Sequence, residues 1–130
     1  MLPLSSLVDA ESAAITYLMP LLAADFPDVQ ISNRGSGARF VRVRRVGGVE
    51  LSPNHDRPQL DVIVWHDSDK TRMQLAMSLW LWLRAANNDV AGDAVVLYAS
   101  TTLGPRQLPD PADSTKTVCM FTVELITRAA

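Results

Sequence analysis

Apolar residues near the start of the chain recur with the spacing of one helical face. The residues of this face are Leu7, Ala10, Ala14, Leu18 and Leu21. Spacings of three and four predict a helix that buries one side. We expect it over residues 6–19, with Ser5 or Ser6 as its N-cap. Because Pro20 removes an amide donor, only an irregular turn is expected from there to residue 24.

A second helical pattern follows the polar segment Asp67-Ser68-Asp69, and it predicts a helix over residues 71–86 capped by Asp67 or Ser68. Its apolar positions form two adjacent stripes, one of Met73, Ala76, Met77 and Trp80 and one of Leu75, Leu79 and Trp82. This band is wide for a helix that lies on a sheet, where one side normally stays wet. Either the helix is unusually buried or part of the band meets another chain.

Five segments have the residue types of β-strands. They cover residues 29–31, 39–46, 59–66, 94–103 and 116–127. The third of them, QLDVIVWH, is apolar on both faces, which is typical of a central strand covered by a helix. The segments 49–58 and 104–115 contain several prolines, and they are expected to be loops.

The order of these elements predicts an α+β fold. Its sheet should have four to five strands, mainly antiparallel, with two helices packed on one face. A chain of 130 residues suits a single domain covering residues 1–130. With 48% hydrophobic and 20% charged residues, the composition is that of a globular protein and argues against disorder.

Composition also excludes several classes of function. No segment approaches the roughly 18–20 unbroken apolar residues of a membrane helix. The single cysteine, Cys119, excludes an internal disulfide framework and a multi-cysteine metal site. The net charge of −2 gives no overall attraction to nucleic acid.

Candidate catalytic and metal-binding residues are few. His55 and His66 are the only histidines, and their spacing matches no common metal motif. Cys119 lies within a strand pattern, which indicates a buried inert thiol. Asp67 and Asp69 could bind a divalent ion, but capping of the following helix explains both. We expect no enzyme, no cofactor and no metal site.

A cluster of arginines is the strongest chemical signal in the chain. It consists of Arg34, Arg39, Arg42, Arg44 and Arg45, with no acidic residue among them. Clustered arginines can bind nucleic-acid phosphates, form a protein interface, or protect an edge strand from aggregation. Acidic residues lie in both predicted loops, namely Glu50, Asp56, Asp110 and Asp113. Copies of the chain could therefore meet head to tail, and such contacts close into a ring when the rotation fits.

Several segments together resemble one known family. They are YLMPLLAADFPDV, the strand RFVRVRRVGG, the strand DRPQLDVIVWHDSD, the helix MQLAMSLWLWLRA, and an LPDPADS loop leading into KTVCMFTVELITRA. In this order they are similar to the small tail terminator proteins of long-tailed phages, especially those that infect actinobacteria. The resemblance covers nearly the whole chain; Pro20 and Trp80-Leu81-Trp82 lie outside its pattern.

The resemblance implies a structural virion protein without catalytic residues. Members of the family form a hexameric ring on the last ring of the tail tube, stop tube growth, and present the surface that joins the head. The implied partners are copies of the chain, the tail tube protein, the connector or head-closure protein, and genomic DNA that passes through the lumen unread. The implied location is the virion, after assembly in the host cytoplasm.

The residues that match the family in its contact segments are the basic strand and the LPDP loop. They are Arg39, Arg42, Arg44, Arg45, Leu108, Pro109, Asp110 and Pro111. We expect them to contact other subunits or the tube. Two alternatives stay open. One is another neck protein, of the head-closure or tail-completion type, for which a helix content well below a quarter would be expected. The other is a small nucleic-acid-binding module that uses the arginine strand.

Overall fold

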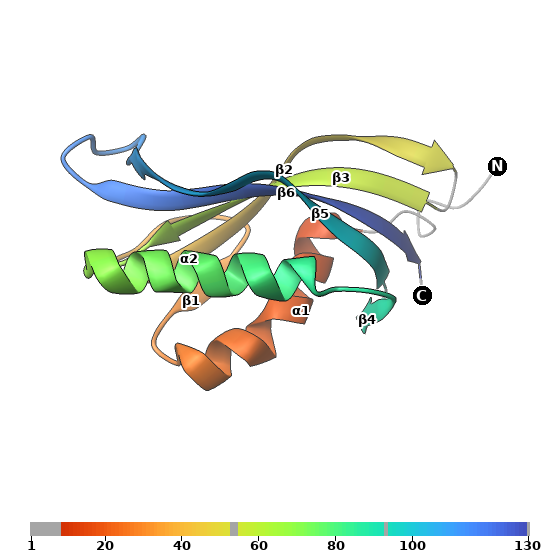
Figure 1. Ribbon diagram of the computed structural model, residues 1–130, viewed down its shortest axis with the longest axis horizontal. Coiled ribbons are helices and arrows are strands. Elements are labelled where there is room, and N and C mark those ends of the chain that lie inside the picture. The colour runs from red at the N-terminus through yellow and green to blue at the C-terminus, as the bar shows by residue number, and fades with distance from the viewer. Residues whose placement is uncertain (1–8, 53–54, 93, 130) are drawn as a thin grey trace.

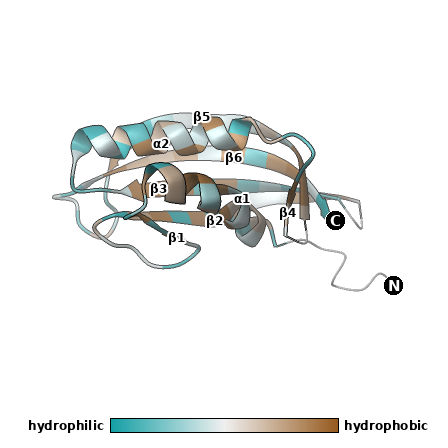
Figure 2. Ribbon diagram, turned by 90° about the horizontal axis from the view of Figure 1, so that it is seen from below, coloured by the Kyte–Doolittle hydropathy of each residue, from teal (hydrophilic) through white to brown (hydrophobic). Residues whose placement is uncertain are grey.

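A computed structural model describes residues 9–52, 55–92 and 94–129 of the chain. This part contains the elements α1 (Ala10–Asp25), β1 (Gln30–Ser32), β2 (Phe40–Ser52), β3 (His55–Trp65), α2 (Asp69–Arg84), β4 (Asp89–Ala91), β5 (Ala94–Pro109) and β6 (Thr117–Ala129). The strands form one curled sheet in the order β1-β2-β3-β6-β5-β4. Both helices lie on the same side of this sheet, as Figures 1 and 2 show. The α+β class and the two helices on one face are therefore confirmed.

The sheet is larger and more mixed than predicted. Its described part has six strands, because the three-residue strand β4 pairs with the start of β5. The short polar segment after α2 gave no strand signal, and Asn88 turns the chain there with a φ of 56°. The edge strand β1 runs parallel to β2, while the other neighbouring strands are antiparallel.

The predicted loop over residues 49–58 is wrong for all of its described residues. Strand β2 continues to Ser52 and β3 begins at His55, so this segment is the end of a long antiparallel hairpin. Residues 53 and 54 lie outside the described part. Gly48 makes the pairing possible, since it adopts a φ of 113° directly opposite Pro58.

The predicted loop over residues 104–115 is also shorter than expected. Strand β5 continues to Pro109, with irregular register between Thr101 and Arg106. Pairing with β6 resumes there and brings Leu108 opposite Val118. Only residues 110–116 connect the two strands.

The two helices begin at polar caps. In α1, Asp9 is the N-cap and accepts a hydrogen bond from the Ser12 amide at 3.1 Å. The predicted caps Ser5 and Ser6 lie outside the described residues. The helix also continues through Pro20 to Asp25, so its predicted end was too early. In α2 the predicted Ser68 cap is confirmed, because its hydroxyl accepts from the Thr71 amide.

The main core fills the space between the helices and the sheet. Its fully buried side chains include Leu18, Val41, Val43, Leu60, Val62, Val64, Leu75, Leu79, Phe121, Val123 and Leu125. β3 lies between β2 and β6, which confirms that the QLDVIVWH segment is a central strand. Neither helix of the described chain is long and apolar enough to span a membrane.

The wide apolar band of α2 is divided among several neighbours. Trp82 packs against the core and its carbonyl accepts the Tyr17 hydroxyl of α1 at 2.9 Å. Trp80 donates its indole N–H to Thr101 of β5 at 2.8 Å. Contacts with α1 and β5 therefore explain most of the width, while Met77 and Leu81 stay exposed.

Candidate interaction surface

The side of the sheet away from the helices, hereafter the open face, carries more positive than negative charge. Strand alternation places Arg42, Arg44, Arg57, Arg106 and Arg128 on this face. The same register adds two carboxylates, Asp61 and Glu124, near its centre. Asp61 accepts the Thr122 hydroxyl at 2.7 Å, and Glu124 lies 3.7 Å from Arg57. Tyr98 and Leu103 are exposed beside them. Exposed aromatic, aliphatic and arginine side chains together are typical of a protein interface.

Among the arginines predicted to form contacts, Arg44 is the one whose charge has no partner within the described chain. It is exposed on β2, and its side chain forms no hydrogen bond or ion pair with any residue in the described part of the chain. Asp61, which lies opposite Arg44 on β3, accepts a hydrogen bond from the Thr122 hydroxyl instead. The guanidinium of Arg44 is therefore available to a partner molecule.

Arg42 is instead held within its own chain. Its guanidinium lies 5.0 Å from the centre of the Trp65 ring, a cation–π geometry. The same group donates to the Gly35 carbonyl at 3.3 Å. Arg42 thus links the 33–37 turn to the end of β3.

Arg39 lies directly before β2 and is held by two carboxylates. It forms ion pairs with Asp28, before β1, and with Asp67, before α2. Hydrogen bonds from Arg39 lower the pKa of both carboxyl groups, and they raise the pKa of Arg39 itself. All three side chains are 43% exposed or more, so this cluster remains accessible at the surface.

Arg45 and Asp56 also pair within the chain. Two guanidinium nitrogens of Arg45 contact the two carboxylate oxygens of Asp56, one at 2.9 Å. The backbone N–H of Arg45 donates to Glu11 of α1 at 2.7 Å. Glu11 thus covers one amide on the outer edge of β2, which hinders pairing with a strand of another chain at that point.

The LPDP segment is partly buried. Leu108 packs against a small cluster formed by Phe40, Trp65 and Val118. Asp110 is 7% exposed, and it accepts hydrogen bonds from the Trp65 indole and from the Ala112 amide, each at 2.9 Å. Pro109 and Pro111 are exposed. The prolines and Arg44 are therefore better placed than Asp110 to contact another molecule.

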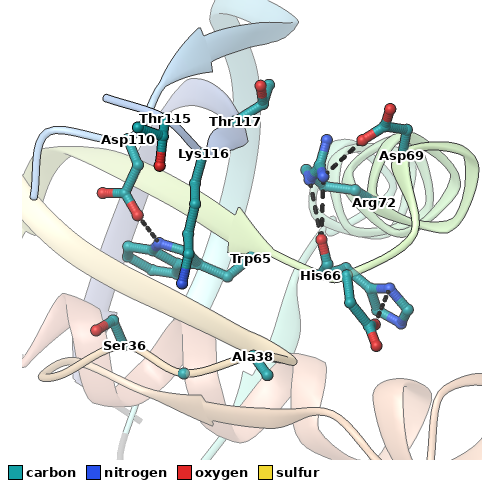
Figure 3. A pocket seen from close by; sticks show the side chains of 12 residues that line it. Ser36, Ala38, Trp65, His66, Asp69, Arg72, Asp110, Thr115, Lys116 and Thr117 are labelled. Atoms are coloured by element: carbon teal, nitrogen blue, oxygen red, sulfur yellow. Dashed lines mark hydrogen bonds and ion pairs between the residues drawn. The ribbon is translucent and has the colours of Figure 1, made fainter. Parts of the chain in front are cut away.

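Trp65 belongs to this surface although it is not among the contact residues predicted from the sequence. It joins the two predicted segments, because Arg42 lies over its ring and Asp110 accepts its N–H. Figure 3 shows this bond at the end of β3. A tryptophan on the strand face away from the helices was the available signal.

A hollow of about 670 Å³ lies next to Trp65 (Figure 3). Its walls come from the turn 36–38, the end of β3, the first turn of α2 and the 110–116 connection. Arg72 is buried in one wall and donates to the His66 carbonyl at 3.1 and 3.2 Å and to Asp69 at 2.8 Å.

The other candidate chemical groups have structural roles. Cys119 is buried and unpaired, and burial raises the pKa of its thiol, as expected for an inert cysteine. The Nδ1 of His66 accepts the Ser68 amide at 3.0 Å. In the described residues, no three His, Cys, Asp or Glu side chains gather as metal ligands would.

No protein-family model and no curated protein sequence matches the chain. A proposal on its function therefore rests on the resemblance to tail terminators and on the geometry of the open face.

Proposed function

We propose that the protein is a tail terminator, a structural protein that forms a ring on the end of a phage tail tube. The observation that carries this proposal is the open face, the side of the sheet that neither helix of the described chain covers, where arginines and exposed apolar side chains lie together. In a ring, each subunit contacts its two neighbours through different patches of its surface. The open face is one large patch that the described chain leaves uncovered. The segments that carry the family resemblance occur along these same elements.

Two alternatives are weighed against this proposal. The described residues contain two helices of 16 residues each, which is about a quarter of them. The helix content expected for another neck protein, well below a quarter, is therefore not found in the described part of the chain. The nucleic-acid alternative gains from Arg57, Arg106 and Arg128, which share the open face with Arg42 and Arg44. However, Asp61 and Glu124 at its centre would repel phosphates. A protein partner fits this mixed surface better.

The first experiment measures the mass of the purified protein in solution, alone and after mixing with tail tubes that lack their cap. A ring of six subunits, or a monomer that forms a ring only on tube ends, would support the proposal. A monomer that leaves the tubes uncapped and binds short DNA duplexes at low salt would contradict it, because binding through phosphates weakens steeply with salt.

A pair of charge reversals tests the surface itself. Arg44→Glu should prevent or strongly weaken ring assembly, because this exposed charge has no partner within the described chain. Lys70→Glu, at an exposed position on the helical side, is the matched control and should assemble normally. Normal capping of tubes by the Arg44→Glu protein at physiological salt would exclude Arg44 from the contact.

A further inference from the structure

His66 lies between the end of β3 and the start of α2, and its imidazole ring is nearly buried. The side chain is 8% exposed, whereas the carboxylate of the next residue, Asp67, is 60% exposed. The carbonyl of His66 accepts two hydrogen bonds from Arg72 of α2, which Figure 3 shows. The ring is therefore attached to a backbone segment that α2 holds in place.

One nitrogen of this ring has two neighbours that it cannot bind at the same time. Nδ1 accepts the Ser68 amide N–H at 3.0 Å, which requires that Nδ1 carry no proton. The same atom lies 3.0 Å from Oδ1 of Asp67, and this contact is attractive only when Nδ1 carries a proton. A ring nitrogen either donates or accepts, so one of the two contacts is always unsatisfied.

The protonation state of His66 selects between these contacts. A neutral ring that carries its proton on Nε2 gives the Ser68 amide, at the N-cap of α2, its acceptor. A charged ring carries a proton on Nδ1 as well, so it loses this bond and gains an ion pair with Asp67. Histidine changes its charge between about pH 5 and about pH 8, so both states are accessible under ordinary conditions.

Charged groups from several elements surround the ring. Arg39, directly before β2, lies 3.2 Å from the same Oδ1 atom of Asp67, so a charged His66 shares this oxygen with a second cation. Other charged groups lie nearby on α2, before β1 and in the 110–116 connection. They are Asp69, Arg72, Asp28, Asp110 and Lys116. Within the described chain, Asp67 is the carboxylate at ion-pair distance from the ring, so the charged state of this nearly buried group depends on it.

We propose that His66 is a proton-controlled switch at the start of α2. In its neutral state it holds the Ser68 amide. In its charged state it releases this amide, pairs with Asp67 and competes with Arg39 for Oδ1 of that carboxylate. Arg39 also binds Asp28, so the change reaches the segment before β1. The switch acts within one subunit and does not rest on the proposed function.

The test is a pH titration of the full-length protein by NMR, from about pH 8.5 to about pH 5. Long-range ¹H–¹⁵N spectra of the imidazoles show which ring nitrogen carries the proton, and amide spectra report on Ser68. The His55→Gln variant identifies the signals of His66. We expect a neutral His66 ring with its proton on Nε2 at the alkaline end. As the pH falls, the Ser68 amide signal should move upfield with the same midpoint as the ring, because the amide loses its acceptor.

The Asp67→Asn variant keeps the shape of the side chain and removes the charge that stabilises the protonated ring. It should move the midpoint of the His66 titration to lower pH by about half a pH unit or more. Asp113→Asn is the matched control. It removes an exposed carboxylate that bonds Thr115 in the 110–116 connection, and it should leave the midpoint unchanged.

The titration of the natural protein is decisive by itself, so the test does not depend on the folding of a variant. A neutral His66 ring with its proton on Nδ1 would overturn the proposal, and so would a ring that stays neutral throughout the titration. A Ser68 amide signal that does not follow the ring, or the same His66 midpoint in the Asp67→Asn and Asp113→Asn proteins, would overturn it as well.

Discussion

Trp65 donates its indole N–H to Asp110 at 2.9 Å and thereby ties the end of β3 to the connection between β5 and β6. The ring of Trp65 also carries the guanidinium of Arg42 at 5.0 Å. One aromatic side chain therefore holds together the basic strand and the LPDP loop. These two segments therefore contact each other within one subunit. Their exposed residues, Arg44, Pro109 and Pro111 among them, are placed to contact a second subunit.

Asp110 should stabilise the 110–116 connection strongly. Its two carboxylate oxygens accept from Trp65 and from Ala112 in a buried setting. Asp110→Ala would leave the indole N–H without its acceptor, and we expect a loss of about 1–3 kcal/mol in the free energy of unfolding. Asp113→Ala is the matched control. Asp113 accepts from Thr115 at the surface of the same connection, so its replacement should cost less. Denaturant unfolding of both variants measures the difference, and equal losses would contradict this role of Asp110.

Arg42 and Arg44 should contribute differently to the stability of the fold, although they are neighbours on the same face of the sheet. Arg42→Ala removes the contact with Trp65 and the bond to Gly35, and it should lower the free energy of unfolding by about 1 kcal/mol. Arg44→Ala removes no described side-chain bond and should change it by less than about 0.5 kcal/mol. Chemical denaturation of the two proteins checks this. A larger loss for Arg44→Ala would mean that Arg44 supports the fold of its own subunit.

The sequence predicted those elements whose signal is local and periodic. The central strand β3 and the Ser68 cap of α2 were found because alternation and capping act over a few residues. The sequence does not predict the hairpin at the end of β2, because Pro58 favours a loop. Its position opposite Gly48 in the register depends on pairing with a strand that the local pattern does not specify.

The candidate site was predicted only in part for a similar reason. The spacing of the arginines along the chain identified the cluster. It could not foresee that Arg45 finds Asp56 across the hairpin, since that pair depends on the register of β2 and β3. Arg57, Arg106 and Arg128 reach the open face from distant segments, and only the topology of the sheet brings them there.

Gly48 should be required for the hairpin. A Cβ atom at this position would lie 2.2 Å from the Arg57 carbonyl oxygen, and the φ of 113° disfavours any other residue. Gly48→Ala should therefore cost about 2 kcal/mol or more. Gly104→Ala is the control, because a Cβ there meets nothing within 4 Å. The control should be neutral or slightly stabilising. Comparison of the thermal midpoints of the two variants tests this; similar midpoints would contradict the pairing of β2 with β3 near Gly48.

Cys119 should resist modification while the protein is folded. The side chain is fully buried, and burial raises its pKa above the ordinary value of 9.0, so the reactive thiolate is scarce at neutral pH. A thiol reagent should label Cys119 slowly in buffer and rapidly in denaturant. Equally rapid labelling in both conditions would show that the core around β6 opens readily.

The Arg39 cluster should make stability depend on acid pH. Hydrogen bonds from Arg39 hold the pKa values of Asp28 and Asp67 below their ordinary value of 3.8. Near pH 4 the folded state thus binds fewer protons than the unfolded state. The stabilisation is complete above that pH and is lost as the pH falls through the lower, folded-state values.

In the Arg39→Gln protein, stability should fall less steeply as the pH is lowered. Added salt should also weaken this pH dependence in the natural protein, because the groups are exposed. Arg34→Gln, a nearby exposed arginine without a described side-chain partner, is the control. Urea midpoints measured from pH 6 to pH 2.5 test this prediction. If the midpoint falls as steeply with pH in the Arg39→Gln protein as in the Arg34→Gln protein, the Arg39 cluster is not the cause of the acid sensitivity.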